Sequence, residues 1–122
     1  MVERVPPEVE AKYTKYLKVK EVLDTVSQER LNIEATIAEI SSILESLEKL
    51  GDDVELFKLM GYVLVKTTKD SLMSELRDRK EELEARLLTV KRQENQLREE
   101  LERLSSEIRE LLSGRTGAGA GG

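Results

Sequence analysis

The stretch "LFKLMGYVLVKTTKD", Leu56–Asp70, differs in character from the sequence on either side of it. The flanking segments are rich in Glu, Lys, Arg and Leu, a composition typical of long helices and coiled coils. Here the residues turn apolar and β-branched on both sides of Gly61. Such runs around a glycine indicate two strands joined by a tight turn. The sequence therefore predicts one β-hairpin, with strands Val54–Met60 and Tyr62–Thr68, inside a helical chain.

A heptad pattern of apolar residues runs along each flanking segment. Pro6-Pro7 suits the start of the first helix, because proline is tolerated in a first helical turn. Steps of three and four residues then alternate, which is coiled-coil spacing, apart from one stutter at Leu83–Leu87. The first seam is Tyr16, Val19, Leu23, Val26, Arg30, Ile33, Ile37, Ile40, Leu44 and Leu47, and the second is Leu72, Leu76, Arg79, Leu83, Leu87, Val90, Glu94, Leu97, Leu101, Leu104, Ile108 and Leu111.

The two helical segments have similar lengths, so we expect an antiparallel coiled coil joined at the bend by the hairpin. Arg30 is the polar member of the first seam. We interpret its stem as packed and its guanidinium as reaching water, although a seam charge can also set register or partner choice. Acid-before-base pairs four residues apart, such as Glu75/Arg79 and Glu94/Arg98, are interpreted as supporting solvated helix faces.

Turn and capping residues set the expected boundaries. Gly51 suits the position after a helix and Asp52-Asp53 suits a turn, while Asp70 or Ser71 is the expected N-cap of the second helix. The Gly-rich end "GRTGAGAGG" is expected to be a disordered coil. The resulting segments are an N-terminal tip at 1–7, a helix at 8–50, the hairpin element at 51–70, a helix at 71–112 and the tail at 113–122.

Composition narrows the function classes. The chain is 37% charged and 3% aromatic, with one Phe and no Trp, which leaves few large side chains for an ordinary globular core. Its net charge of -5 argues against general affinity for nucleic acid or anionic membrane, and no apolar run is long enough to span a bilayer. The absence of His and Cys removes the commonest bases and metal ligands. We expect no enzyme, no cofactor and no metal, and a cytoplasmic location.

The predicted hairpin needs a partner. An isolated two-stranded hairpin is marginally stable in water, and its two free edges invite pairing. We therefore interpret it as an assembly element whose copies join into a larger sheet or barrel between subunits. The alternative is a hairpin folded back onto its own coiled coil. The expected assembly residues are Val54, Leu56, Phe57, Leu59, Tyr62, Val63, Leu64 and Val65.

The block "DDVELFKLMGYVLVKTTKD" between two heptad arms resembles the β-type subunits of the prefoldin family, and the similarity continues through "EELEARLLTVKRQENQL". The resemblance implies two antiparallel helices joined by a hairpin, in a cytosolic hexamer of two longer α-type and four β-type subunits. Their hairpins would form a platform of β-barrels. It also implies ATP-independent capture of unfolded polypeptides at the arm tips and delivery to the group II chaperonin. The Gly-rich tail is longer than the family pattern suggests.

The free ends of the arms are the expected client-binding sites. Coiled-coil ends fray, because terminal turns have fewer contacts and unpaired backbone groups. Several weak apolar patches on one frame gain effective concentration. The candidates are Val5, Val9, Tyr13, Leu111 and Leu112, which could instead close the seam. By resemblance, chaperonin contacts also belong there, with Glu107, Arg109 and Glu110 as ionic candidates.

Two rival interpretations remain open from the residues alone. A structural coiled-coil scaffold or spacer without clients would fit the heptads, but it leaves the hairpin unexplained. A leucine-zipper DNA binder needs a basic helix leading into the zipper, and the segment "PPEVEAKYTKYLKVKEVLD" mixes its lysines with acidic residues.

Overall fold

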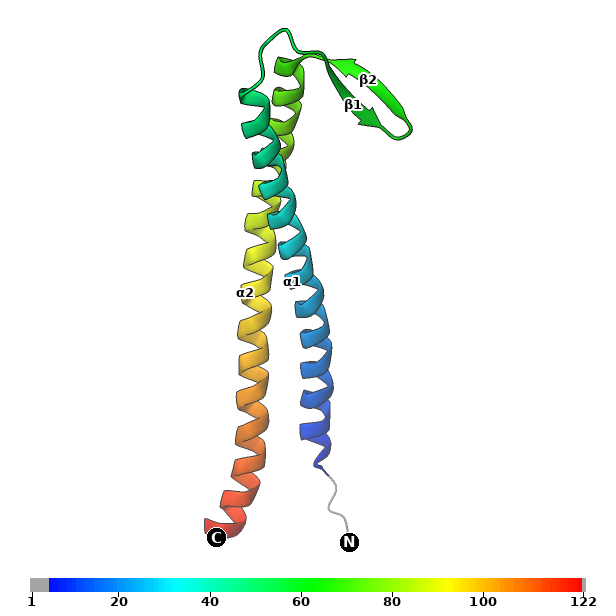
Figure 1. The fold of residues 1–122 in the computed structure, drawn as a ribbon. Coiled ribbons are helices and arrows are strands. Elements are labelled where there is room, and N and C mark those ends of the chain that lie inside the picture. Colours follow the sequence, from blue (N-terminus) through cyan, green and yellow to red (C-terminus); the bar gives the residue numbers. More distant parts are fainter. Residues whose placement is uncertain (1–4, 122) are drawn as a thin grey trace. The chain divides into compact units, whose positions relative to one another are not determined.

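The computed structural model describes residues 5–121, and the side chains of residues 5–114. Helix α1 (Pro7–Glu48) is followed by strands β1 (Leu56–Met60) and β2 (Val63–Thr67) and by helix α2 (Lys69–Gly121), as Figure 1 shows. The predicted class, two long helices with one β-hairpin between them, is confirmed. The hairpin is an antiparallel two-stranded sheet.

The residues form two compact units, Met1–Glu29 with Val90–Gly122, and Arg30–Thr89. In the first unit, ion pairs join the early part of α1 to the late part of α2, Lys12 to Glu107 and Lys15 to Glu100. In the second unit, Glu48 at the end of α1 pairs with Arg77 near the start of α2. Within each unit the two helix segments therefore run antiparallel.

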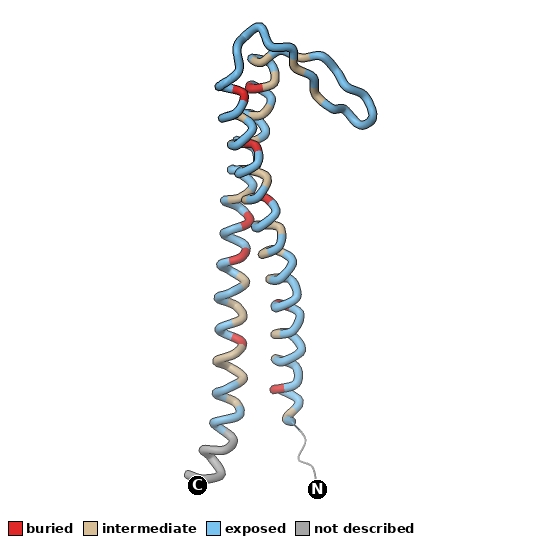
Figure 2. Tube along the Cα trace, in the orientation of Figure 1, coloured by how far each residue is buried: buried red, intermediate tan, exposed pale blue. Residues whose placement is uncertain are grey.

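The heptad seam forms the core of both units. The buried apolar residues of the first unit are Val9, Val19, Val90 and Leu104, and those of the second are Ile33, Ile40, Leu47, Met73 and Leu83. Figure 2 shows these positions recurring along the helices, whereas the hairpin carries none. The 3.6-residue helical repeat explains the pattern, because it returns a side chain to one face every three or four residues.

Two seam predictions on α2 need correction. Met73 is buried and Leu72 is only half-buried. Arg79 is exposed and pairs with Glu82 at 3.4 Å instead of lying in the seam. Met73, Leu76, Lys80 and Leu83 alternate steps of three and four, so the core-facing side is displaced by one residue at these positions. The aliphatic stem of Lys80 can lie along the seam while its ammonium reaches water, and Arg79 keeps its guanidinium in solvent.

The hairpin has a two-residue turn. Its register pairs Met60 with Val63 and Leu59 with Leu64, which places Gly61 and Tyr62 at the turn. Gly61 has φ of 59° and is the only described residue with positive φ. Positive φ at the first central position is the type II′ pattern, whose twist suits a hairpin. The predicted strands were therefore too long, since Val54 precedes β1 and Tyr62 belongs to the turn.

The N-cap of α2 is Thr68, not Asp70 or Ser71 as the sequence suggested. The Thr68 hydroxyl accepts a hydrogen bond from the Ser71 backbone N–H at 3.1 Å, and the Leu72 N–H donates to the Thr68 carbonyl at 3.0 Å. One residue separates β2 from the helix, so the cap falls earlier than the residue types alone indicated. Asp70 lies in the first turn, where the helix dipole favours its charge.

Helix α2 also differs from expectation at its far end, because it continues to Gly121 where a disordered tail from 113 was predicted. Gly122 lies outside the described residues. Extending an existing helix costs far less than nucleating one.

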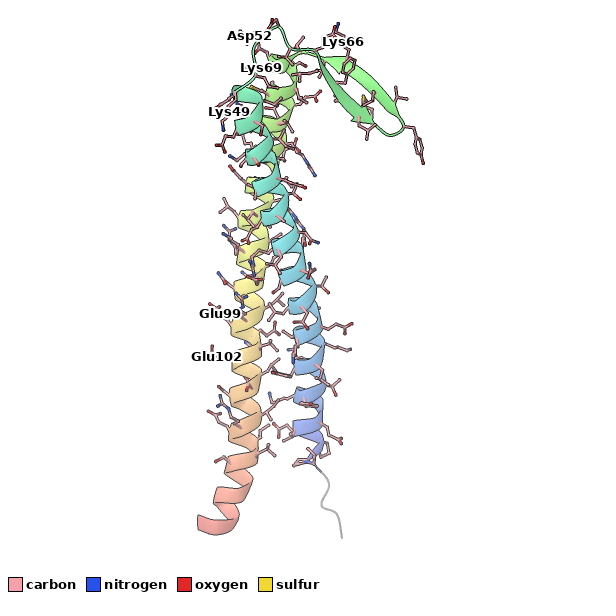
Figure 3. The ribbon with its side chains drawn as sticks, viewed as in Figure 1. Lys49, Asp52, Lys66, Lys69, Glu99 and Glu102 are labelled. Carbon is pink, nitrogen blue, oxygen red and sulfur yellow. The ribbon has the colours of Figure 1, made fainter. Side chains whose placement is uncertain are left out.

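Lys69 connects the end of α1 to the start of α2. Its ammonium donates to the carbonyls of Leu50 at 2.7 Å and Glu48 at 3.4 Å, and it lies 3.7 Å from an Asp52 carboxylate oxygen. Figure 3 shows Lys69 and Asp52 together where the helices meet the hairpin. The terminal carbonyls of a helix lack intrahelical partners, and a cation there also complements the helix dipole.

We expect Lys69→Met to lower the free energy of unfolding by about 1–2 kcal/mol, because two carbonyls lose a charged donor. The Lys69 side chain is only 16% exposed, so water replaces the ammonium poorly. Chemical denaturation followed by helical circular dichroism measures the change. Lys66→Met is the matched control, since that side chain is 67% exposed and its ion pair with Glu55 is a surface one. Equal effects of the two substitutions would contradict the capping role.

Candidate functional site

The hairpin is the main exposed apolar surface in the second unit. Of the expected assembly residues, Tyr62, Leu59, Leu64 and Val63 are the most exposed. Phe57, Val54 and Val65 are also exposed, and Leu56 is half-buried. Met60, which the sequence analysis did not select, is 56% exposed and pairs directly with Val63. Large exposed apolar patches are a feature that protein interaction sites share.

The two faces of the hairpin differ in composition. Alternation along each strand puts Phe57, Leu59 and Leu64 on one face, with Lys66 at its base; this is the Leu59 face. Leu56, Lys58, Met60, Val63 and Val65 lie on the other, the Met60 face. Both strands are edge strands, because the sheet has only two. Each edge can therefore accept a further strand through its unpaired backbone groups.

An ion pair attaches the hairpin to α2. The Lys58 ammonium lies 2.7 Å from a Glu75 carboxylate oxygen, with the two side chains 29% and 52% exposed. The sequence predicted that Glu75 would pair with Arg79 on its own helix, but Arg79 pairs with Glu82. Glu75 pairs with a strand residue instead, because the hairpin brings Lys58 next to this turn of α2. Spacing along the chain could not predict a contact between residues of two different elements.

The helix ends in the first unit hold the expected client-binding residues. Tyr13, Val5 and Leu112 are about half-exposed, and Leu111 is half-buried. The ring of Tyr13 stacks on that of Tyr16, with 6.2 Å between centroids. These side chains present apolar surface around the start of α1 and on α2 about nine residues before its last residue, Gly121.

The position of Val9 corrects its expected role. Only 5% of Val9 is exposed, so it fills the seam in this structure and offers no contact surface. It lies one heptad before Tyr16, and the seam extends a full heptad beyond the first residue assigned to it. The alternative of seam closure therefore describes Val9, and the heptad spacing alone could have indicated this.

A network of charges crosses the seam beside these residues. The Lys12 ammonium lies 2.9 Å from Glu107, and Lys15 lies 3.8 Å from Glu100. Arg103 on α2 connects the two carboxylates, 3.9 Å from Glu100 and 4.0 Å from Glu107. Glu107, expected as a chaperonin contact, is thus engaged within the chain, while the Arg109 guanidinium donates to the Ser106 hydroxyl at 3.3 Å.

Glu94 lies inside the seam of the first unit. Only 3% of it is exposed, and its carboxylate lies 3.1 Å from the Arg98 guanidinium one turn later. The predicted pair Glu94/Arg98 is therefore confirmed. A buried carboxylate is tolerated when a cation and hydrogen bonds compensate its lost hydration, and no described buried side-chain polar atom lacks a hydrogen-bond partner.

Metal-ligand clusters and membrane-spanning helices are both absent from the described residues. These residues contain no group of three or more acidic, His or Cys side chains placed to hold a metal ion. None of their helices is long and apolar enough to cross a membrane.

Comparison with known proteins gives consistent results. A family model described as "Prefoldin subunit" matches residues 10–115. The chain belongs to the prefoldin family. It is 43% identical to a prefoldin subunit beta of Saccharolobus islandicus over 93% of this chain and 90% of that one. Over the same shares of both chains, it is 38% identical to a prefoldin subunit beta of Sulfurisphaera tokodaii.

A solved structure agrees with this assignment. The crystal structure of the prefoldin beta subunit from Thermococcus strain KS-1 matches with a TM-score of 0.82 and 33% identity, covering 91% of this chain and 97% of that one. The match to the prefoldin family model includes the hairpin and most of both helices. Among the site residues discussed above, only Val5 and Val9 lie outside the matched range. Prefoldin subunits form hetero-oligomers with other prefoldin subunits.

The seam charges perturb one carboxyl group of this prefoldin-family chain. The hydrogen bond from Lys12 lowers the pKa of Glu107 below its usual 4.5; burial opposes the shift, and the charges of Lys12, Arg103 and Lys15 add to it. A lowered folded-state pKa means that the ionised carboxylate stabilises the fold above the unfolded pKa. This contribution disappears as the pH falls through the lower, folded-state pKa.

We expect the stability difference between the wild type and Lys12→Met to be largest near neutral pH and to shrink as the pH falls below 4.5 and Glu107 becomes protonated. Denaturation midpoints across that pH range measure the difference. An NMR titration of Glu107 should give a pKa below 4.5 in the wild type and a higher one in Lys12→Met. Lys15→Met should raise that pKa less, because Lys15 pairs with Glu100 and its charge is the smallest of the effects that lower the pKa of Glu107. An unshifted Glu107 in the wild type would contradict the hydrogen bond.

Proposed function

We propose that this chain is the β-type subunit of an ATP-independent chaperone. It would assemble through its hairpin with α-type prefoldin subunits and other copies of itself, with four β-type and two α-type subunits in the hexamer. It would capture unfolded polypeptides at its helix ends and deliver them to the group II chaperonin in the cytoplasm. The supporting observation is that the seam leaves apolar side chains exposed at the hairpin in one unit and at the helix ends in the other.

The assembly step is supported by the state of the hairpin. A two-stranded sheet with exposed apolar side chains on both faces is unstable alone. Pairing with further hairpins would bury those side chains and satisfy the backbone groups of both edges. A stable interface of this kind would also keep the surface from non-specific aggregation.

The capture step is supported by the modest size of each helix-end patch. Val5, Tyr13 and Leu112 are each about half-exposed, so covering one of them contributes about 1 kcal/mol. A dissociation constant of even 1 mM requires about 4 kcal/mol. One subunit end therefore binds an unfolded segment weakly, and several ends on one assembly bind it together through effective concentration. Such binding is unselective and reversible without nucleotide.

The delivery step is supported by the exposed charges near the helix ends. Arg109 and Glu110 are exposed on α2, whereas Glu107 is held by Lys12. Arg109 and Glu110 are therefore better placed than Glu107 for ionic contact with a chaperonin.

Light scattering tests the assembly step. We expect the 13.9 kDa chain, mixed with an α-type prefoldin subunit of the same organism, to form a complex with the mass of six subunits, because both hairpin edges require partners. The chain alone is the control for self-association. A chain that stays monomeric or dimeric with every α-type partner would favour a coiled-coil spacer and would contradict the proposal.

Substitutions at the helix ends test the capture step. We expect Tyr13→Ser with Leu112→Ser to weaken suppression of aggregation of a denatured client severalfold, since each assembled subunit loses two apolar contacts. The mass of the complex should stay unchanged. Leu88→Ser is the matched control, because Leu88 on α2 is 68% exposed but lies in the other unit. Unchanged suppression by an intact complex of the double variant would reject capture at the helix ends.

A further inference from the structure

We propose that the Leu59 face of the hairpin, formed by Phe57, Leu59 and Leu64, is the face that packs against the hairpins of other prefoldin subunits, and that Lys58 and Glu75 are the positioning residues that present it. This inference rests on the proposed function, since it presumes assembly through the hairpin. It adds which of the two apolar faces becomes the interior of the assembled sheet, and what selects that face.

The burial of the hairpin is unequal on its two faces. At the base of the Met60 face, Leu56 and Thr67 are half-buried. The Lys58 side chain is 29% exposed, and Val65 is 37% exposed. At the same level on the Leu59 face, Phe57 is 52% exposed and the Lys66 side chain is 67% exposed. Within this unit, the chain therefore already covers the base of the Met60 face and leaves the Leu59 face open.

The Lys58–Glu75 ion pair accounts for the difference. Lys58 is the middle residue of β1, and its side chain extends from the Met60 face to α2, where its ammonium lies 2.7 Å from Glu75. The pair holds that face toward α2, so the opposite face points away from the helix. Figure 1 shows the hairpin extending from the end of the helices beside the start of α2.

Charge also disfavours the Met60 face as an interior. Enclosing that face between hairpins would either strip Lys58 from Glu75 or bury the pair, and an uncompensated buried charge is strongly destabilising. The Leu59 face carries a lysine as well, but Lys66 is one pair from the base, is 67% exposed and lies 3.4 Å from the exposed Glu55. Its ammonium can stay at a solvated rim while the three apolar side chains beyond it are enclosed.

The occupant of this face is the corresponding hairpin of another prefoldin subunit. A strand added to either edge of the sheet continues its pleat, so the Leu59 faces of neighbouring hairpins would line one common surface. Leu59 and Leu64 are direct cross-strand partners, and their side chains form a compact apolar pair whose equivalent on the next hairpin is chemically complementary.

Two double variants of the full chain, assembled with its α-type subunit, test the choice of face. Leu59→Thr with Leu64→Thr alters one cross-strand pair, and Met60→Thr with Val63→Thr alters the adjacent pair on the opposite face. The four residues are similarly exposed, at 56–70%, and threonine keeps the preference for strand. We expect the first variant to raise the dissociation constant of the complex about tenfold or more, and the second to change it about threefold at most.

The outcomes separate this inference from the proposed function. Equal weakening by both variants, or greater weakening by the Met60–Val63 variant, would overturn the choice of face and leave hairpin assembly standing. No weakening by either variant, with the wild type assembling, would overturn hairpin assembly itself. Unchanged helical circular dichroism of the free subunits shows that each variant retains its coiled coil.

A charge exchange tests the positioning residues. We expect Lys58→Glu and Glu75→Lys to weaken assembly severalfold when made singly, because each places like charges together. The double exchange, Lys58→Glu with Glu75→Lys, should restore it by re-forming the pair in reverse. The positioning role would be overturned if the double exchange failed to restore assembly. It would also be overturned if the single variants assembled like the wild type. The exchange at Lys66 and Glu55, whose pair lies at the rim, is the control and should leave assembly unchanged.

Discussion

The heptad seam is the interaction on which the rest of this structure depends. Two helices in contact bury one narrow stripe of each, and here that stripe consists of single Val, Ile, Leu and Met side chains repeated every three or four residues. In the part of the chain that the structure describes, no second layer covers the rest of the helix surfaces. Apolar residues that lie off the stripe, in the hairpin and at the helix ends, therefore stay exposed. The surfaces proposed for assembly and for client capture follow from this limit on burial.

Several polar contacts lie at the junction of the helices and the hairpin, where the apolar seam does not extend. At the junction of helices and hairpin, Thr68 caps α2, Lys69 caps the carbonyls at the end of α1, and Lys58 holds the hairpin to α2 through Glu75. These few groups set the direction of a strand pair that has no core of its own. Orientation of the hairpin thus depends on single hydrogen bonds and ion pairs, each sensitive to one substitution.

At the helix ends, charge and apolar packing act together. Lys12 and Glu107 form an ion pair across the seam, one helical turn from the buried Val9. Tyr13, which directly follows Lys12, is exposed. Surface ion pairs of this kind contribute little stability each because solvent screens them, so they hold the two helices together only weakly here. A client that offers apolar contacts could compete with such a closure, whereas a tightly packed end would resist it.

The sequence by itself determined the element types, the heptad seam of α1, the hairpin around Gly61 and the family, because these depend on local spacing and on a distinctive block of residues. It also indicated the exposed hairpin as an interaction surface. Only the tertiary structure decided that Thr68 is the N-cap, that Met73 replaces Leu72 in the core, that Lys58 reaches Glu75, and that Lys69 reaches the Glu48 and Leu50 carbonyls. Those contacts join residues from different elements, and their geometry depends on how the helices and the hairpin meet, which no periodicity along the chain records.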